Sequence, residues 1–275
     1  MEHDEKDLLD RVSRVRWKAR GAMPFFGHLL MRMEPVVDAT CKSAYVTPGF
    51  KMGIGPEFAA SLTDAELATV LLHETLHAAF LYWSRSKHMT AIVRTKDGGR
   101  IPLSNIAHDY VVNLLIEDGT KGCRAVFEPP STFAPTIPGS PEPFRLLIDP
   151  KYRDMSFEEV YDALLEEPPE GDGDGDGEGE GEGDGQGQDE GSGPGEGGRK
   201  APKGARKHHA DAKDNGDEEG EGEGGNSGAK EAQDWKMVLR EARHVHNEEA
   251  SRKAQGNLPG SLKRALKGLL EPRVP

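Results

Sequence analysis

The sequence predicts an α+β protein: a mostly helical domain with a small β-sheet, then a disordered acidic linker, then a helical C-terminal tail. Apolar residues recur at helical spacing in most segments before residue 167. Residues 41–58 instead combine glycine and proline with residues that favour strands. Residues 168–229 are of low complexity and consist mainly of Gly, Asp and Glu. We therefore divide the chain into a domain at 1–167, a linker at 168–229 and a C-terminal segment at 230–275.

The first elements are expected to be two helices and a pair of strands. Residues 4–21 carry an apolar helix face formed by Leu8, Val12, Val15 and Ala19. A shorter helix is predicted between Pro24 and Pro35. Strands are predicted at 43–46 and 50–54, around a turn at Pro48 and Gly49. Residues 92–103 contain an Asp-Gly-Gly turn signal at 97–99, which is typical of a β-hairpin.

The helix that follows residue 62 has clear start signals. Thr63 is a favourable N-cap, and Glu66 three residues later completes a capping box. Its apolar positions continue to about Trp83. A later helix is predicted from an N-cap at Ser104 to a C′ glycine at Gly119.

The second half of the chain alternates between helices and irregular segments. Residues 120–148 contain many prolines and predict a surface loop. Ser156 and Glu159 form a capping box at the start of a helix that reaches residue 167. Beyond the linker, helices are predicted at 234–256 and 261–270.

The net charge of −13 is concentrated in the linker, because residues 170–196 hold eleven acidic residues and no basic one. The rest of the chain is nearly neutral and gives no reason to expect nucleic-acid binding. The linker cannot bury enough apolar surface to offset its conformational entropy, so we expect disorder there. Its adjacent His208 and His209 are more typical of a solvated tail than of a metal site.

The expected location of the protein and the expected state of its two cysteines follow from sequence signals that are absent. No apolar run approaches the roughly 18 residues of a membrane-spanning helix, and the acidic N-terminus does not resemble a signal peptide. We expect a cytoplasmic protein with no membrane partner. Cys41 and Cys123 are far apart and not in a CxxC spacing, which predicts two reduced thiols.

Residues 69–80 read TVLLHETLHAAF and place His73 and His77 one helical turn apart, with Glu74 beside the first. Side chains at i and i+4 share a helix face, so both imidazoles can bind one cation. Zinc accepts such nitrogen ligands at about 2.0–2.1 Å, and Glu74 would take a proton from water rather than bind the metal. The alternative is a pair of hydrogen-bonded core histidines. We disfavour it because burying such polar groups unpaired costs several kcal/mol.

A catalytic zinc site needs a third protein ligand. Asn105, Asp109 and Asn113 recur every four residues on one face of a later predicted helix. Asp109 is the carboxylate of this stripe, and the two asparagines could support it or the imidazoles. The alternative ligands are His108, Glu117 and His88. Spacing alone does not decide between Asp109 and His108.

Three segments in fixed order carry a family resemblance: HETLHAAFLYWSR, SNIAHDYVVNLLIEDG and LLIDPKYRDMSFEEVYDALLEE. They resemble the bacterial and phage metallopeptidase domain that commonly precedes a von Willebrand A-like domain. The likeness covers residues 1–167 and resumes at 235–275. It implies a zincin-like fold in which His73, His77 and Asp109 bind Zn²⁺ and Glu74 is the general base.

The chain departs from this family in two places. Tyr82 stands where many members carry another histidine, so its supporting role at the site is an expectation specific to this chain. The chain also ends at PRVP, where the family usually continues into the von Willebrand A-like half. We therefore expect a fragment or a shortened form.

The resemblance and the HExxH pattern together predict a zinc metallopeptidase that acts on a peptide or protein substrate. Zinc would lower the pKa of water towards about 7, and Glu74 would take its proton and pass it to the leaving amine. Tyr82 and Tyr110 are candidates for steadying the oxyanion, although each is more often a packing residue. The alternative is a non-catalytic zinc-binding adaptor that works with a AAA+ ATPase or a von Willebrand A-like partner. A glutamate at position 74 favours catalysis, because a structural site needs no base there.

Overall fold

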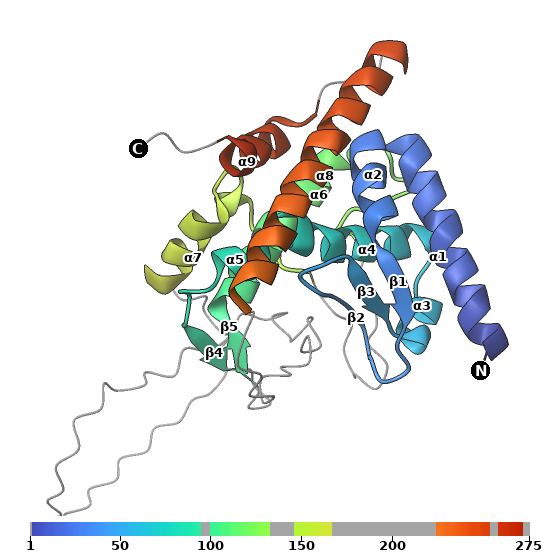
Figure 1. Ribbon diagram of the computed structural model, residues 1–275, viewed down its shortest axis with the longest axis horizontal. Helices are drawn as coiled ribbons and strands as arrows, with labels where there is room; N and C mark the ends of the chain where they lie inside the picture. The colour runs from blue at the N-terminus through green and yellow to red at the C-terminus, as the bar shows by residue number, and fades with distance from the viewer. Residues whose placement is uncertain (1, 95–99, 133–145, 167–223, 254–257, 272–275) are drawn as a thin grey trace, which may run out of the picture.

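The computed structural model describes residues 2–94, 100–132, 146–166, 224–253 and 258–271 (Figure 1). Within these residues the protein is mostly helical, with one three-stranded and one two-stranded sheet. This confirms the predicted α+β class. The predicted turn at 97–99, part of the loop at 120–148, and most of the linker with its histidine pair lie outside the described residues.

The N-terminal half contains α1 (Glu2–Ala22), α2 (Pro24–Arg32), β1 (Glu34–Val37), β2 (Ala44–Val46), β3 (Lys51–Ile54), α3 (Pro56–Ser61), α4 (Asp64–Ala79) and α5 (Tyr82–Arg85). It is followed by β4 (Ile92–Arg94), β5 (Arg100–Pro102), α6 (Leu103–Gly119), the 3-10 helix η1 (Pro150–Tyr152), α7 (Phe157–Glu166), α8 (Gly224–Lys253) and α9 (Gly260–Leu270). The predicted helices are therefore present, and α3 is an addition that the sequence does not predict.

The three-stranded sheet has the order β1-β3-β2, with β1 parallel and β2 antiparallel to the central strand β3. Strands β2 and β3 confirm the two strands predicted around Pro48 and Gly49. Strand β1 is not predicted by the sequence, because Pro35 within it indicates the end of a helix. Pro35 is tolerated there since β1 is an edge strand that pairs on one side only.

Helix α4 begins where predicted but ends earlier. The Thr63 hydroxyl accepts a hydrogen bond from the Glu66 backbone at 3.2 Å, and the Glu66 carboxylate accepts one from the Thr63 backbone at 2.8 Å. Leu81 has a φ of 61°, in the left-handed region, so α4 stops before it and Tyr82 starts the separate helix α5. The prediction of one helix up to Trp83 is wrong because apolar periodicity does not reveal a left-handed turn at a non-glycine residue.

Helix α6 differs from its prediction at both ends. Pro102 is the N-cap, so Ser104 lies inside the first turn. Gly119 is the last helical residue and not the C′ position. A Cβ atom at Gly119 would lie 2.4 Å from the ring of Phe26, so glycine is required there by the close approach of α2.

Two apolar clusters form the core. The larger one combines α1, α2, the three-stranded sheet and α4 with α8 and α9, and the smaller one combines β4, β5 and α7. Helix α6 contributes side chains to both clusters. It therefore fixes the two parts of the core relative to each other.

The C-terminal helices pack on the first part of the chain. Figure 1 shows α8 running beside α2, and the two helices are in contact. Trp235 on α8 is 1% exposed, and its indole N–H donates to the carbonyl oxygen of Pro48 at 3.2 Å. An ion pair at 2.7 Å joins Arg20 of α1 to Glu249 of α8. Helix α8 starts at Gly224, so it includes residues 224–229 that the sequence assigns to the linker.

Three smaller expectations concern caps, thiols and membranes. The predicted capping box of α7 is present, with the Ser156 backbone donating to the Glu159 carboxylate at 2.6 Å. Cys41 and Cys123 are free thiols, as predicted, and burial raises the pKa of Cys41. Among the described helices, none is both long and apolar enough to cross a membrane.

Replacing Thr63 by alanine tests the start of α4. We expect Thr63→Ala to lower the free energy of unfolding by about 1 kcal/mol, because the orphan backbone donor loses its acceptor. Thr63→Ser keeps a hydroxyl at the same position and serves as the matched control. Denaturant unfolding followed by circular dichroism measures both variants. Equal midpoints for the two would contradict a stabilising capping box.

Candidate metal centre

The side chains of His73 and His77 on α4 and of Asp109 on α6 meet in the protein interior. The Nε2 atoms of the two imidazoles are 2.9 Å apart. The Oδ1 atom of Asp109 lies 3.5 Å from Nε2 of His73 and 3.0 Å from Nε2 of His77. The three residues are only 6%, 0% and 3% exposed. In the part of the chain that the structure describes, this is the one group of His, Cys, Asp and Glu side chains spaced to hold a metal ion.

The three atoms form a triangle with the dimensions of one face of a tetrahedral metal site. Ligands at about 2.0–2.1 Å from zinc are separated by about 3.3 Å when the angles are tetrahedral. A cation placed among these two nitrogens and the carboxylate would be bound by all three groups together. The residues present therefore fit a divalent cation, and a donor set of two nitrogens and one oxygen suits zinc.

Asn113 determines which nitrogen of His73 is available. Its amide nitrogen donates to the carbonyl oxygen of Leu147 at 2.9 Å, so its amide oxygen faces His73. The Nδ1 atom of His73 lies 2.9 Å from that oxygen and must donate to it, since a carboxamide oxygen only accepts. The neutral imidazole then keeps its lone pair on Nε2, the atom that faces His77 and Asp109.

His108 lies behind His77 and not in the triangle. The Nδ1 atoms of the two imidazoles are 2.8 Å apart. The other side of His108 packs edge to face on Phe157, with ring centroids 4.9 Å apart. A His77 imidazole that uses Nε2 as a ligand carries its proton on Nδ1 and donates it to His108. The structure thus places Asp109, and not His108, beside the two Nε2 atoms.

The site has an excess of negative charge. Burial lowers the pKa of His73, but the carboxylates of Asp109 and Glu74 raise it overall. Glu74 is itself 3% exposed. Two carboxylates buried beside two imidazoles attract a cation, either a proton or a metal ion.

Asn105 is the third member of the polar stripe on α6, one turn before Asp109. It is 4% exposed, and its carboxamide oxygen has no hydrogen-bond partner among the described residues. An unsatisfied buried oxygen costs about 1–3 kcal/mol, so Asn105 is suited to receive a donor from outside the chain.

The two candidate tyrosines lie in different surroundings. Tyr82 packs edge to face on His77 with ring centroids 5.9 Å apart, and its hydroxyl lies 3.2 Å from Oγ of Ser104. Burial raises the pKa of Tyr82, so the phenol stays protonated at neutral pH. Tyr110 packs on Tyr152 within the smaller apolar cluster. Tyr82 is therefore the phenol next to the candidate ligands.

The remaining alternative ligands are not brought to the triangle. Glu117 accepts a hydrogen bond from Arg153 at 2.9 Å near the end of α6, and His88 is exposed after α5. The supporting carbonyl of Leu147 and the ring of Phe157 are not identified by sequence reasoning. A backbone carbonyl has no sequence signature, and Phe157 reads as an ordinary apolar helix position.

The fold and the site together define a helical α+β domain with a buried His-His-Asp centre. The family model described as "Putative metallopeptidase domain" matches residues 13–275. The protein belongs to this family, since the match covers most of the chain, and the predicted family is confirmed. The chain matches none of the curated proteins and none of the solved structures with which it was compared.

Metal analysis of purified variants tests the triangle. We expect His77→Ala and Asp109→Ala to lose most of the bound zinc, because two donors cannot hold the ion as three can. His88→Ala removes an exposed histidine outside the triangle and should retain the wild-type metal content. Plasma mass spectrometry on folded protein gives the stoichiometry. Full zinc in Asp109→Ala would contradict this ligand set.

Substitution of Asn113 tests how His73 is held. We expect Asn113→Ala to weaken zinc affinity by about 10- to 100-fold, because Nδ1 of His73 loses its acceptor. Asn113→Asp keeps an acceptor oxygen and should weaken zinc less. Competition with a chromogenic chelator measures both affinities. Equal affinities for the two variants would show that this hydrogen bond does not prepare the imidazole.

Proposed function

We propose that this protein is a zinc-dependent metallopeptidase that hydrolyses peptide bonds in peptide or protein substrates. The observation that supports this most strongly is the buried triangle of two Nε2 atoms and one carboxylate oxygen, with sides of 2.9, 3.0 and 3.5 Å. Membership of a metallopeptidase-domain family supports the same reaction class.

In this proposal each residue of the site has one task. His73, His77 and Asp109 hold the ion, while Asn113 and His108 keep the two imidazoles in the required orientation. Bound zinc supplies a Lewis acid that lowers the pKa of water to about 7 and polarises a carbonyl group. In this arrangement both imidazoles carry their proton on Nδ1, so that both Nε2 atoms can bind the ion.

Glu74 is the proposed general base. It follows His73 directly on α4 and lies in the same buried surroundings, with 3% of its surface exposed. Its carboxylate takes the proton of the attacking water and delivers it to the nitrogen of the leaving amine. Burying a carboxylate costs free energy, and a functional role for Glu74 would explain why it is buried.

Tyr82 and Asn105 are proposed to contact the substrate. A protonated phenol beside the ligands can donate to the oxygen that becomes negative during the attack. The carboxamide oxygen of Asn105 can accept a backbone N–H of the bound peptide. Tyr82 contacts the ring of His77, and Asn105 lies one helical turn before Asp109 on α6.

The change Glu74→Gln separates catalysis from simple metal binding. We expect this variant to keep its zinc and to lose hydrolysis of a denatured, fluorescently labelled protein by at least about 100-fold, because the amide cannot accept the proton. Glu57→Gln, an exposed glutamate on α3, is the matched control and should be unaffected.

Equal hydrolysis by Glu74→Gln and the wild type would contradict the proposed mechanism. Zinc binding with no hydrolysis in either protein would favour the adaptor function, in which the ligands serve structure and partner binding only. Metal content and proteolysis must therefore be measured on the same preparations.

A further inference from the structure

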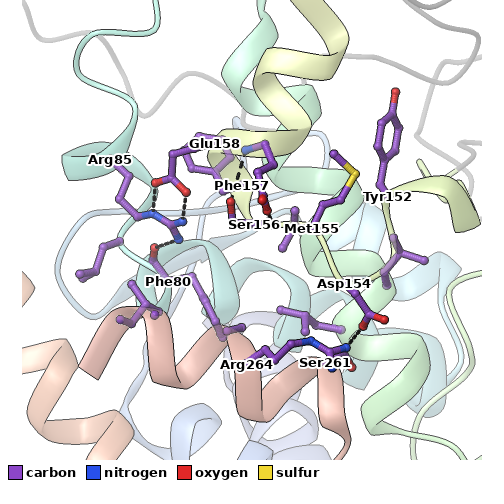
Figure 2. A pocket seen from close by; sticks show the side chains of 18 of the residues that line it. Phe80, Arg85, Tyr152, Asp154, Met155, Ser156, Phe157, Glu158, Ser261 and Arg264 are labelled. Carbon is purple, nitrogen blue, oxygen red and sulfur yellow. Dashed lines mark hydrogen bonds and ion pairs between the residues drawn. The ribbon is translucent and has the colours of Figure 1, made fainter. Parts of the chain in front are cut away.

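A cavity lies against the side of α6 that is turned away from Asp109. Figure 2 shows it between the start of α7 and the C-terminal helices. Val111, Leu115 and Asp118 of α6 line it, and the helical repeat places them about 180–240° around the helix from Asp109. The same helix therefore presents the candidate metal ligand on one face and this cavity on the other.

The cavity has the size and lining of a small-molecule site. Its volume is about 430 Å³, within the range of about 300–1,000 Å³ found for ligand pockets. At about 30 Å³ per water molecule in the liquid, this is room for roughly a dozen non-hydrogen atoms. Its walls are mainly apolar and include Phe80, Leu115, Met155, Phe157, Ala265 and Leu269.

Every acidic side chain that lines the cavity already has a partner within the protein. Two ion pairs lie at its edges, Arg85 with Glu158 at 2.6 Å and Arg264 with Asp154 (Figure 2). The other two acidic residues are also engaged. Asp118 pairs with Arg153, and Glu159 caps the backbone of Ser156.

Lys236 of α8 is the exception among the charged residues that line the cavity. The described residues offer it no ion-pair or hydrogen-bond partner. The three lining arginines pair with carboxylates, so Lys236 is the one lining cation among the described residues that is not engaged in an ion pair, and it lies beside an apolar wall. Such a site is complementary to a molecule with an apolar body and a single negative end.

We propose that this cavity binds a small aliphatic carboxylate, with the chain against the apolar wall and the carboxylate on the Lys236 ammonium. The site is separate from the metal centre, because the ring of Phe157 and the imidazole of His108 lie between them. The proposal therefore does not depend on the peptidase function. It also assigns a role to the C-terminal helices, which supply Lys236, Ala265 and Leu269.

Calorimetric titration of the full chain with octanoate tests the proposal. We expect octanoate to bind at least about tenfold more tightly than 1-octanol, since a charge-assisted hydrogen bond is added to the same apolar contact. Lys236→Met removes the ammonium and keeps an unbranched side chain, and should abolish this preference. Lys263→Met, an exposed lysine on α9 outside the lining, should leave it unchanged.

Filling the cavity gives an independent test. Ala265→Phe should weaken octanoate binding by tenfold or more while zinc content stays at the wild-type level. If that variant does not fold, Gly268→Leu serves the same purpose, because a Cβ there meets no heavy atom within 4 Å. Melting temperature and circular dichroism confirm that the variants used are folded.

Three results would overturn the proposal. One is equal affinity for octanol and octanoate. Another is octanoate binding that both Lys236→Met and the cavity-filling variants leave intact. The third is tighter binding of an apolar peptide amide than of octanoate, since that result would make the cavity a peptide site that does not use the carboxylate.

Discussion

Asp109 brings a carboxylate to 3.0 Å from one imidazole and 3.5 Å from another in a place that solvent barely reaches. Removing a carboxylate from water is costly unless a positive charge compensates it. The Nε2 atom of His73 offers a lone pair, and that of His77 does so when its proton lies on Nδ1. A shared cation satisfies all three groups at once. The candidate chemistry follows from this compensation.

The rest of the fold holds that contact in place. The capping box at Thr63 fixes the start of α4, and the left-handed residue Leu81 ends it before Tyr82, whose ring then packs against His77. Gly119 lets α2 approach the end of α6, which joins the two apolar clusters. Helix α6 thereby serves two sites: its polar stripe faces α4, and its opposite face forms a wall of the cavity lined by Lys236.

Features with a local physical cause could be predicted from the sequence. The capping boxes and the HExxH spacing act within four residues, so the start of α4 and the pairing of its histidines can be read directly. Asp109 and His108 are adjacent and differ by about 100° around α6, so only the rotation of that helix decides which one meets the imidazoles. Tertiary packing sets this rotation. The edge strand at Pro35 and the turn at Leu81 escaped prediction for the same reason, since each breaks a local rule that the surrounding fold overrides.

Zinc K-edge X-ray absorption spectroscopy on protein purified without chelators identifies the atoms that bind the ion. If His73, His77 and Asp109 are the ligands, we expect a coordination sphere of nitrogen and oxygen atoms at about 2.0–2.1 Å, with the outer scattering of two imidazoles. Sulfur at about 2.3 Å, an absence of imidazole scattering, or a folded protein that retains no metal would contradict it.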